Sequence, residues 1–419
     1  ASSIGVKMND ISNCSDTATL SVLENTKWMG KKFTINEFGN LQKQSNGLFI
    51  KGKVLPLEIA TSSQLKILTD NLQANHALCL GIPKQSGDIL PVAARALQKK
   101  LHKNNLQCLS RTKDDFMFPL NQGWLLIDYD IKDQPVQVTQ KIDELGGILP
   151  TLKHIWPELD QADYLIRPSS SAGVHIEGDT HNNANGFHMF VRLQKAQQIP
   201  QSLLALHARC WENGLGYFII SKSGQLLDRS IIDVSVGSPE RLIFTADPIL
   251  GIGVKRDLQH IIQQNGSALQ KPQMPLNFKW NRQRDIAKQQ RQPKADIKRQ
   301  EFINLQIEQH IKMHGGSHTQ AKAIVAGRIS GRCISDNDSI ELADGSVAIV
   351  SDILDKISRN CVMPCADPIE GRDYNPTAAS ILWGSTHKAP ALISHAHGLT
   401  TVYRFERFEK IQSNKIGGK

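Results

Sequence analysis

The chain has 419 residues, of which 40% are hydrophobic and 21% charged, and its formal net charge at pH 7 is +9. This length suits two or three domains of a globular protein, and the positive charge favours a polyanionic partner. No apolar run approaches the roughly 20 residues of a membrane-spanning helix, and Ala1–Ser21 lacks the pattern of a signal peptide, so we expect no membrane partner.

The cysteines are odd in number and scattered along the chain, which is typical of reduced thiols and leads us to expect a cytoplasmic protein. Their positions are 14, 79, 108, 210, 333, 361 and 365. Cys361 and Cys365 lack a matching second pair, so a zinc site is not expected.

We expect residues 1–120 to form an N-terminal α/β module. The expected elements are a loose polar arm at 1–22, short strands and turns between Trp28 and Leu57, a helix at Ser62–Gln73 capped by Ser62 or Ser63, a buried strand at His76–Ile82, a helix at Asp88–Leu101 with Val92, Ala93, Leu97 and Leu101 inward, and an extended piece at Cys108–Phe118. Arg111 and Lys113 are expected to be solvated loop residues, although both are close enough in sequence to the next strand to reach nucleic acid.

Residues 121–250 predict a β-α-β-β-α-β order, the ferredoxin-like or RRM-like arrangement. The expected elements are strands at Trp124–Asp130, Tyr164–Pro168, Gly186–Leu193, Tyr217–Ser221 and Arg229–Val236, and helices at Gln137–Leu145 and Gln201–Glu212. In such a sheet the first and third strands are neighbours and the last strand flanks the first. His188 should then lie beside Asp128 and Asp130, with Asp233 on the other side.

Two carboxylates one residue apart end the first of these strands. Asp128 and Asp130 project to the same face because side chains alternate along a strand. Their mutual repulsion favours a cation between them, and Mg²⁺ prefers carboxylate oxygens together with substrate phosphates. Asp233, which follows Ile231-Ile232, is the favoured third carboxylate over Asp228, whose position suggests a turn or a cap.

These motifs resemble the archaeo-eukaryotic primase (AEP) superfamily of primase-polymerases, in the versions found in phages, plasmids and integrated elements. Family members carry a strand ending in D-x-D or D-x-E, a second S-x-H motif and a third carboxylate, which Asp128/Asp130, His188 and Asp233 match in order. The similarity covers about Trp124–Asp247. Gly186 replaces the serine of S-x-H, so either a hydroxyl comes from the Ser169–Ser171 run or a backbone N–H takes its place.

The resemblance implies an α/β (α+β) catalytic core with a palm sheet and a template-directed nucleotidyl transfer. Asp128, Asp130 and Asp233 would be the catalytic residues and would hold two Mg²⁺ or Mn²⁺ ions. His188, Arg241 and Ser171 would bind the incoming nucleotide. The implied partners are a single-stranded DNA template, a primer strand, nucleoside triphosphates and a replicative helicase of the same element. No G-x-x-x-x-G-K-[ST] phosphate loop occurs in the chain itself.

The remaining chain predicts a basic helical region or linker at 251–332 and a small C-terminal α+β unit at 333–419. The first part contains 15 Lys and Arg against 5 Asp and Glu, which suits either a nucleic-acid backbone or a solvated linker. The expected elements are helical stretches at Asn281–Arg291, Asp296–His314 with Phe302, Leu305 and Ile311 inward, and Thr319–Ile329, and a hairpin at Ile340–Val350 around Asp344-Gly345.

Three other functions share some of these features. A nucleotidyl cyclase uses paired carboxylates on the same palm but would leave the basic region without a purpose. A nuclease that initiates replication uses a His-x-His metal pair. His395 and His397 match this pattern, but they lie outside the predicted palm. A non-catalytic palm that binds nucleic acid is the third alternative, and retention of all three carboxylates with His188 argues against it. The histidine pair His310 and His314, four residues apart on a helix, lacks a third ligand.

Overall fold

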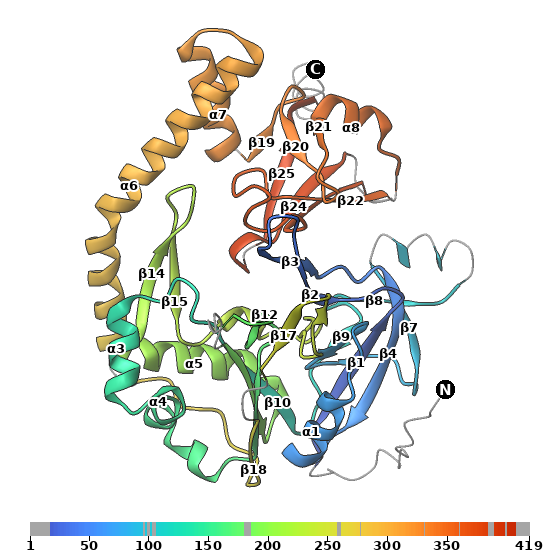
Figure 1. Cartoon of the computed structure of the whole chain (residues 1–419), viewed down its shortest axis with the longest axis vertical. Coiled ribbons are helices and arrows are strands. Elements are labelled where there is room, and N and C mark those ends of the chain that lie inside the picture. The colour runs from blue at the N-terminus through green and yellow to red at the C-terminus, as the bar shows by residue number, and fades with distance from the viewer. Residues whose placement is uncertain are drawn as a thin grey trace, which may run out of the picture. The chain divides into compact units, whose positions relative to one another are not determined.

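The computed structural model describes residues 17–94, 97–98, 101–102, 106–179, 186–257, 261–276, 278–330, 332–359, 361–383, 389–398 and 400–407. The chain is a mixed α+β protein with several small sheets (Figure 1). It divides into two compact units, and the first consists of Ala1–Gln98, Leu106–Tyr217 and Arg229–Arg284. The second consists of Lys99–Asn105, Phe218–Asp228 and Asp285–Lys419. No helix in the described part of the chain is both long and apolar enough to cross a membrane.

The first unit begins with a five-stranded sheet in the order β5-β1-β4-β7-β8. Its strands are β1 (Thr19–Asn25), β4 (Lys51–Glu58), β5 (His76–Cys79), β7 (Leu90–Ala93) and β8 (Leu109–Ser110). Helix α1 (Ser62–Asp70) follows β4, and β6 (Ile82–Pro83) pairs with β9 (Phe116–Met117). The strands at 28–57, 76–82 and 108–118 are thus confirmed in outline.

Three expectations for this region are wrong. The end of the arm predicted at 1–22 belongs to β1, which pairs with β4 and β5, while residues 1–16 lie outside the described residues. The first part of the helix predicted at 88–101 is strand β7, in which Leu90 and Val92 are buried and Pro91 is exposed, the period of a strand. Residues 97–98 and 101 are helical as predicted, and residues 95–96 and 99–100 lie outside the described residues. The N-cap of α1 is Thr61, whose side chain accepts a hydrogen bond from the Gln64 backbone N–H.

The central sheet of this unit has the order β10-β13-β11-β18, with all neighbours antiparallel. Its strands are β10 (Gly123–Tyr129), β11 (Tyr164–Pro168), β13 (Phe187–Leu193) and β18 (Ile262–Gln264). The predicted adjacency of the first and third strands is confirmed, because β10 pairs with β13 along its whole length. Helices α3 (Val136–Glu144), α4 (Ile148–Ile155) and α5 (Ile199–Glu212) accompany the sheet, with α5 in contact with β10.

The last strand of the predicted arrangement is wrong. β14 (Gly216–Ile220) and β15 (Leu226–Ser230) form a separate two-stranded hairpin, and the chain then enters the short helix η3 (Val234–Val236). Asp233 is therefore not in a strand but is the N-cap of η3, where its carboxylate accepts a hydrogen bond from the Ser235 backbone N–H. Aspartate is depleted in strands and favoured at N-caps, which explains the difference. η3 still contacts β10.

A smaller sheet in the order β16-β2-β3 completes the first unit. It contains β2 (Gly30–Ile35), β3 (Leu41–Asn46) and β16 (Ile249–Leu250), and β12 (Val174–Ile176) pairs nearby with β17 (Val254–Arg256). Phe33 packs with Val174 and Val254 in a local apolar cluster. This cluster holds β2 against the β12–β17 pair.

Helix α6 (Lys279–His314) begins in the first unit and continues into the second, where α7 (His318–Ser330) follows. The two stretches predicted at 281–291 and 296–314 are one continuous helix that contains Pro293. Phe302 is buried as expected, but Leu305 is 46% exposed, so that part of the predicted inward stripe is wrong. Ile307 instead packs against Ala321 and Val325 of α7.

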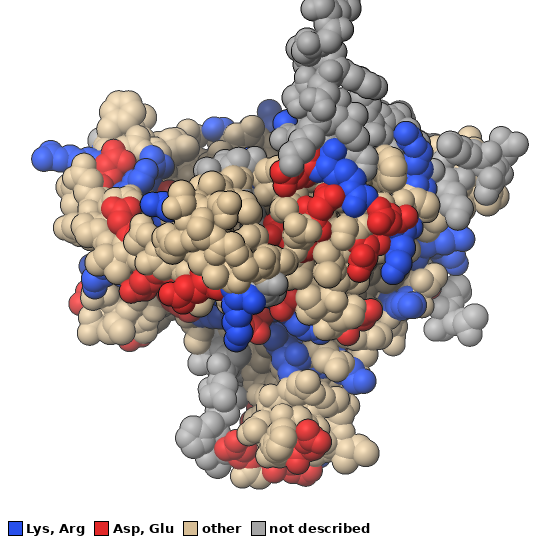
Figure 2. Space-filling view, turned by 90° about the horizontal axis from the view of Figure 1, so that it is seen from above, with Lys and Arg blue, Asp and Glu red and all other residues tan. Residues whose placement is uncertain are grey.

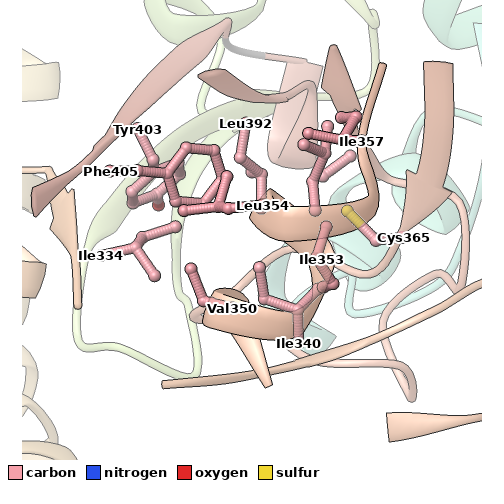
Figure 3. Close-up of a cluster of buried hydrophobic side chains, with 12 residues drawn as sticks. Ile334, Ile340, Val350, Ile353, Leu354, Ile357, Cys365, Leu392, Tyr403 and Phe405 are labelled. Atoms are coloured by element: carbon pink, nitrogen blue, oxygen red, sulfur yellow. The ribbon is translucent and has the colours of Figure 1, made fainter. Parts of the chain in front are cut away.

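The C-terminal part of the second unit contains a five-stranded sheet in the order β19-β25-β24-β23-β22 and helix α8 (Val350–Lys356). Its strands are β19 (Cys333–Ile334), β22 (Cys361–Cys365), β23 (Ala379–Trp383), β24 (Ala391–Ser394) and β25 (Thr401–Phe405). Figure 3 shows the apolar core between α8 and these strands. The predicted hairpin is confirmed, since β20 (Ser339–Glu341) and β21 (Val347–Ile349) pair antiparallel around the turn at Gly345.

Candidate functional site

The end of β10 brings together an acidic and a basic side chain. Asp128 lies opposite His188 in the β10–β13 register, and Asp128 Oδ1 is 3.6 Å from His188 Nε2. His188 is buried, whereas a third of the Asp128 side chain is exposed. Asp130 follows β10 and is exposed, and its Oδ1 accepts a hydrogen bond from the Lys132 backbone N–H at 3.0 Å. The predicted pairing of His188 with Asp128 is therefore present.

The electrostatics of Asp128 show which other groups are near. Burial raises the pKa of the Asp128 carboxyl above its usual value, and the charges of Asp233 and Asp130 raise it further, against the opposing effects of His188 and Lys31. Asp128 thus lies within electrostatic reach of two other carboxylates, although Asp233 arrives from a loop. Like charges held together in this way favour a bound cation.

The loop that carries Asp233 also holds Arg241. Asp233 Oδ1 accepts from the Ser235 N–H at 2.8 Å, and Asp233 Oδ2 accepts from the Ser235 hydroxyl at 3.0 Å. Arg241 Nη1 donates to the Ser235 carbonyl at 3.0 Å. Arg241 therefore supports the η3 backbone, so its guanidinium stabilises the element that positions Asp233.

His188 is held from its other side as well. Its Nδ1 lies 3.2 Å from Thr245 Oγ1, within hydrogen-bond distance, and its ring meets Phe190 edge to face. Burial lowers the pKa of the His188 imidazole, and the nearby charge of Asp128 only partly offsets this. The imidazole is consequently neutral at pH 7 and has one N–H to donate.

The serines after β11 lie beside Gly186, at the start of β13. The Ser169 N–H donates to the Gly186 carbonyl at 2.8 Å, and a Cβ atom added at Gly186 would lie 3.2 Å from Ser169 Oγ and 2.9 Å from the Tyr129 carbonyl oxygen. Residue 186 therefore has no room for a side chain. Ser169 Oγ is 3.4 Å from Ser171 Oγ, so two hydroxyls occupy the space next to the S-x-H position.

Two basic residues that the sequence analysis missed lie at this loop. Lys31, on β2, donates from Nζ to Ser171 Oγ at 2.8 Å. Arg256, on β17, donates to the carbonyls of Ala172 and Ser169, both at 3.0 Å, and its Nη1 lies 2.5 Å from Asp247 Oδ1. Arg256 thus holds the loop in place through its backbone carbonyls, while the side-chain amine of Lys31 lies beside the hydroxyl of Ser171.

The charges of the carboxylates also affect the pKa of the Lys31 amine. Burial lowers this pKa, the charge of Lys43 lowers it further, and the charges of Asp130 and Asp128 raise it. Lys31 is about 100 residues before Asp128, and only the three-dimensional pairing of β2 with β16 and β3 brings it here. Lys31-Lys32 in an expected strand was the one signal in the sequence, and it does not by itself single out either residue.

The site therefore has an acidic side, formed by Asp128, Asp130 and Asp233, and a basic side, formed by Lys31, Lys43 and Arg256. Among the residues that the structure describes, no three His, Cys, Asp or Glu side chains are gathered closely enough to form a ready metal cluster. The donor set still fits a hard divalent cation, because the charges of two further carboxylates act on Asp128 and carboxylate oxygens are the ligands that such a cation prefers. Figure 2 shows a face where Lys and Arg are interspersed with Asp and Glu, so the excess positive charge of the chain is not spread evenly over that face.

Other polar residues of the chain have local partners. Arg111 donates to the Glu240 carbonyl at 3.1 Å, so its guanidinium is not solvated as expected. His175 contacts the Gly173 carbonyl, and Glu177 pairs with Lys255, while His181 lies outside the described residues.

In the second unit, His397 Nε2 is 3.2 Å from Glu370 Oε1, and His395 Nδ1 is 3.1 Å from Thr400 Oγ1. The rings of His310 and His314 lie 4.8 Å apart on α6.

The chain was also compared with known proteins. No family model, no curated protein and no solved structure matches it. The function of the chain is therefore inferred from the geometry of the site and from the motifs in the sequence.

Proposed function

We propose that the chain is a primase-polymerase of a mobile genetic element, which catalyses template-directed nucleotidyl transfer at the site around Asp128. The observation that carries the proposal is that carboxylates and a lysine amine lie close together at the end of β10. Asp128 is within electrostatic reach of Asp130 and Asp233, and also of Lys31, whose amine binds the Ser171 hydroxyl. A nucleoside triphosphate with its divalent cations needs both kinds of charge. The resemblance of the motifs to the AEP superfamily supports the same reaction.

The acidic side is the proposed holder of Mg²⁺ or Mn²⁺, with Asp128, Asp130 and Asp233 as ligands. When bound, such ions lower the pKa of an attacking 3′-hydroxyl and neutralise charge on the transferring phosphoryl group. Asp233 keeps lone pairs for this purpose, because each carboxylate oxygen accepts only one hydrogen bond from Ser235.

The basic side is the proposed holder of the nucleotide phosphates. The Lys31 amine and the hydroxyls of Ser169 and Ser171 provide donors along one loop, and the neutral imidazole of His188 adds one N–H beside Asp128. Arg241, which we first expected to contact the triphosphate, acts in this proposal through η3. The proposed partners are a single-stranded DNA template, a primer strand and a separate replicative helicase.

The test is synthesis on a single-stranded DNA template with Mg²⁺ or Mn²⁺ and labelled nucleotides, with and without a primer. Asp128→Ala should abolish the products while DNA binding is kept. Glu144→Ala is the matched control, since it removes an exposed carboxylate from α3 that only pairs with Lys141 at the surface. Products that form equally with Asp128→Ala would overturn the proposal. Products that need an added primer would restrict the activity to extension.

A second candidate is a palm that binds nucleic acid without catalysis. The observation that favours it is that the described carboxylates do not form a ready three-ligand cluster. The same experiment separates the two functions. Tight, salt-sensitive DNA binding without any synthesis by the wild-type chain would identify a binding module.

A further inference from the structure

One end of the β16-β2-β3 sheet exposes several large apolar side chains. Phe38, in the turn between β2 and β3, is 78% exposed, and Ile252, two residues after β16, is fully exposed. Leu41 and Leu250 are also exposed at this end. We call these four residues the hairpin tip. They come together because Leu41 pairs with Ile35, and the Gly251–Gly253 turn lies against Thr34 and Ile35.

The turn that presents Phe38 is rigidly built. Asn36 Oδ1 accepts from the backbone N–H of Phe38 at 3.0 Å and of Asn40 at 2.9 Å. The Asn36 N–H donates to the Asn40 carbonyl, and the Gly39 N–H donates to the Asn36 carbonyl, with Gly39 at φ +78°. A position with φ > 0 favours glycine, so this sequence specifies the turn. The phenyl ring is therefore displayed by an ordered loop, although its exposure to water is unfavourable.

The same hairpin leads back to the candidate site. Lys31 and Lys43 lie on one face of it, because Lys31 and Phe33 share a face of β2 and Lys43 pairs directly with Phe33. From Lys31 to Ile35 the strand rises about 13 Å, the length of about four stacked nucleotides. The hairpin has three lysines and one carboxylate, Glu37. This charge suits a polyanion, and the exposed ring suits an unpaired base.

We propose that the hairpin tip stacks on unpaired bases of a single-stranded nucleic acid whose backbone follows Lys43 toward the site at Asp128. This deepens the proposed function, on which its direction toward the site rests, because it assigns the surface that holds the template or primer strand. Base stacking on an aromatic ring is tolerant of sequence, and lysines beside it neutralise phosphates. Binding at the tip is consequently expected to depend little on base sequence and strongly on salt.

The experiment measures binding of a fluorescent oligothymidylate of about 16 nucleotides by anisotropy over a series of salt concentrations. Phe38→Ala/Ile252→Ala should weaken binding by about five-fold to a hundred-fold, the loss found when a base-stacking side chain is removed. Phe38→Trp should restore the affinity of the single variant Phe38→Ala, and Glu37→Gln should tighten binding. Ile67→Ala/Leu204→Ala, which removes exposed aliphatic side chains from α1 and α5, should bind as the wild type does.

Each of three results would overturn the inference. One is an unchanged affinity of Phe38→Ala/Ile252→Ala, and another is an equal loss in the control pair. A loss of the same size for a blunt duplex would also contradict it, because paired bases cannot stack on the ring. The binding assay needs no catalysis, so a chain that makes no product but loses affinity with Phe38→Ala/Ile252→Ala would refute the proposed function and leave this inference standing.

Discussion

Ser169 Oγ lies 3.2 Å from the position that a Cβ atom at Gly186 would take. A serine hydroxyl is thus present beside residue 186 although the residue itself carries no side chain. The end of β11 and the start of β13 are hydrogen-bonded here, so the backbone fixes the two positions together. The hydroxyl that an S-x-H motif would place at residue 186 therefore has a neighbour in space, the hydroxyl of Ser169.

A side chain at residue 186 is expected to destabilise the fold. In Gly186→Ser the new Cβ would lie 2.9 Å from the Tyr129 carbonyl oxygen, so the backbone must shift. We expect the free energy of unfolding to fall by about 1–3 kcal/mol, the usual effect of overpacking, as measured by urea denaturation. Gly327→Ser is the control, because a Cβ at that exposed position meets no atom within 4 Å. Equal stability of both variants would contradict the close approach.

Neutralising Asp128 is expected to stabilise the fold while it removes activity. The pKa of Asp128 is raised, chiefly by burial and then by Asp233 and Asp130, so the charged carboxylate is less favourable in the folded state than in the unfolded chain. Asp128→Asn should raise Tm by about 1–4 °C at pH 7 and lower synthesis at least about a thousand-fold. The gain in Tm should shrink as the pH falls through the raised pKa, where the wild-type carboxyl is itself protonated. A lower Tm at pH 7 would show that the charge is stabilising.

The central strands could be predicted from the sequence because their signals are local. Trp124–Ile127 is a continuous apolar run, which is typical of a strand buried on both faces, and all four side chains are buried. The register of Asp128 with His188 follows from strand geometry, and Asp130 lies directly after the end of β10. Two acidic positions of the site and its histidine were therefore accessible before the fold was known.

The rest depends on contacts between distant parts of the chain. Lys31 reaches Ser171 only through the pairing of β2 with its sheet, and no periodicity in the sequence encodes that. Asp233 was expected in a strand because two isoleucines precede it, but its carboxylate hydrogen-bonds Ser235 and begins a helix instead. At Leu90–Ala93 pairing with β4 and β8 overrode an apparent helical pattern.

The pH dependence of stability should carry a contribution from His188. Burial lowers the pKa of its imidazole below the ordinary 6.5, so the unfolded chain takes up a proton more readily than the folded chain. The free energy of unfolding should fall as the pH drops below about 6.5, by at most about 1.4 kcal/mol per pH unit for this one group. His188→Gln should flatten the profile in that window when Tm is measured at several pH values. An unchanged slope would mean that the imidazole is not buried in solution.

Lys31 and Lys32 offer the sharpest test of the basic side of the site, because neighbours on a strand project to opposite faces. The Lys31 amine binds Ser171 Oγ and lies within electrostatic reach of Asp128 and Asp130. Lys31→Met should raise KM for the incoming nucleotide by about 10- to 100-fold, the loss of a charge-assisted contact to phosphate. Lys32→Met, which removes the same charge from the other face of β2, should leave KM within about two-fold of the wild type. If both variants raise KM alike, Lys31 contributes only net charge and the phosphates bind elsewhere.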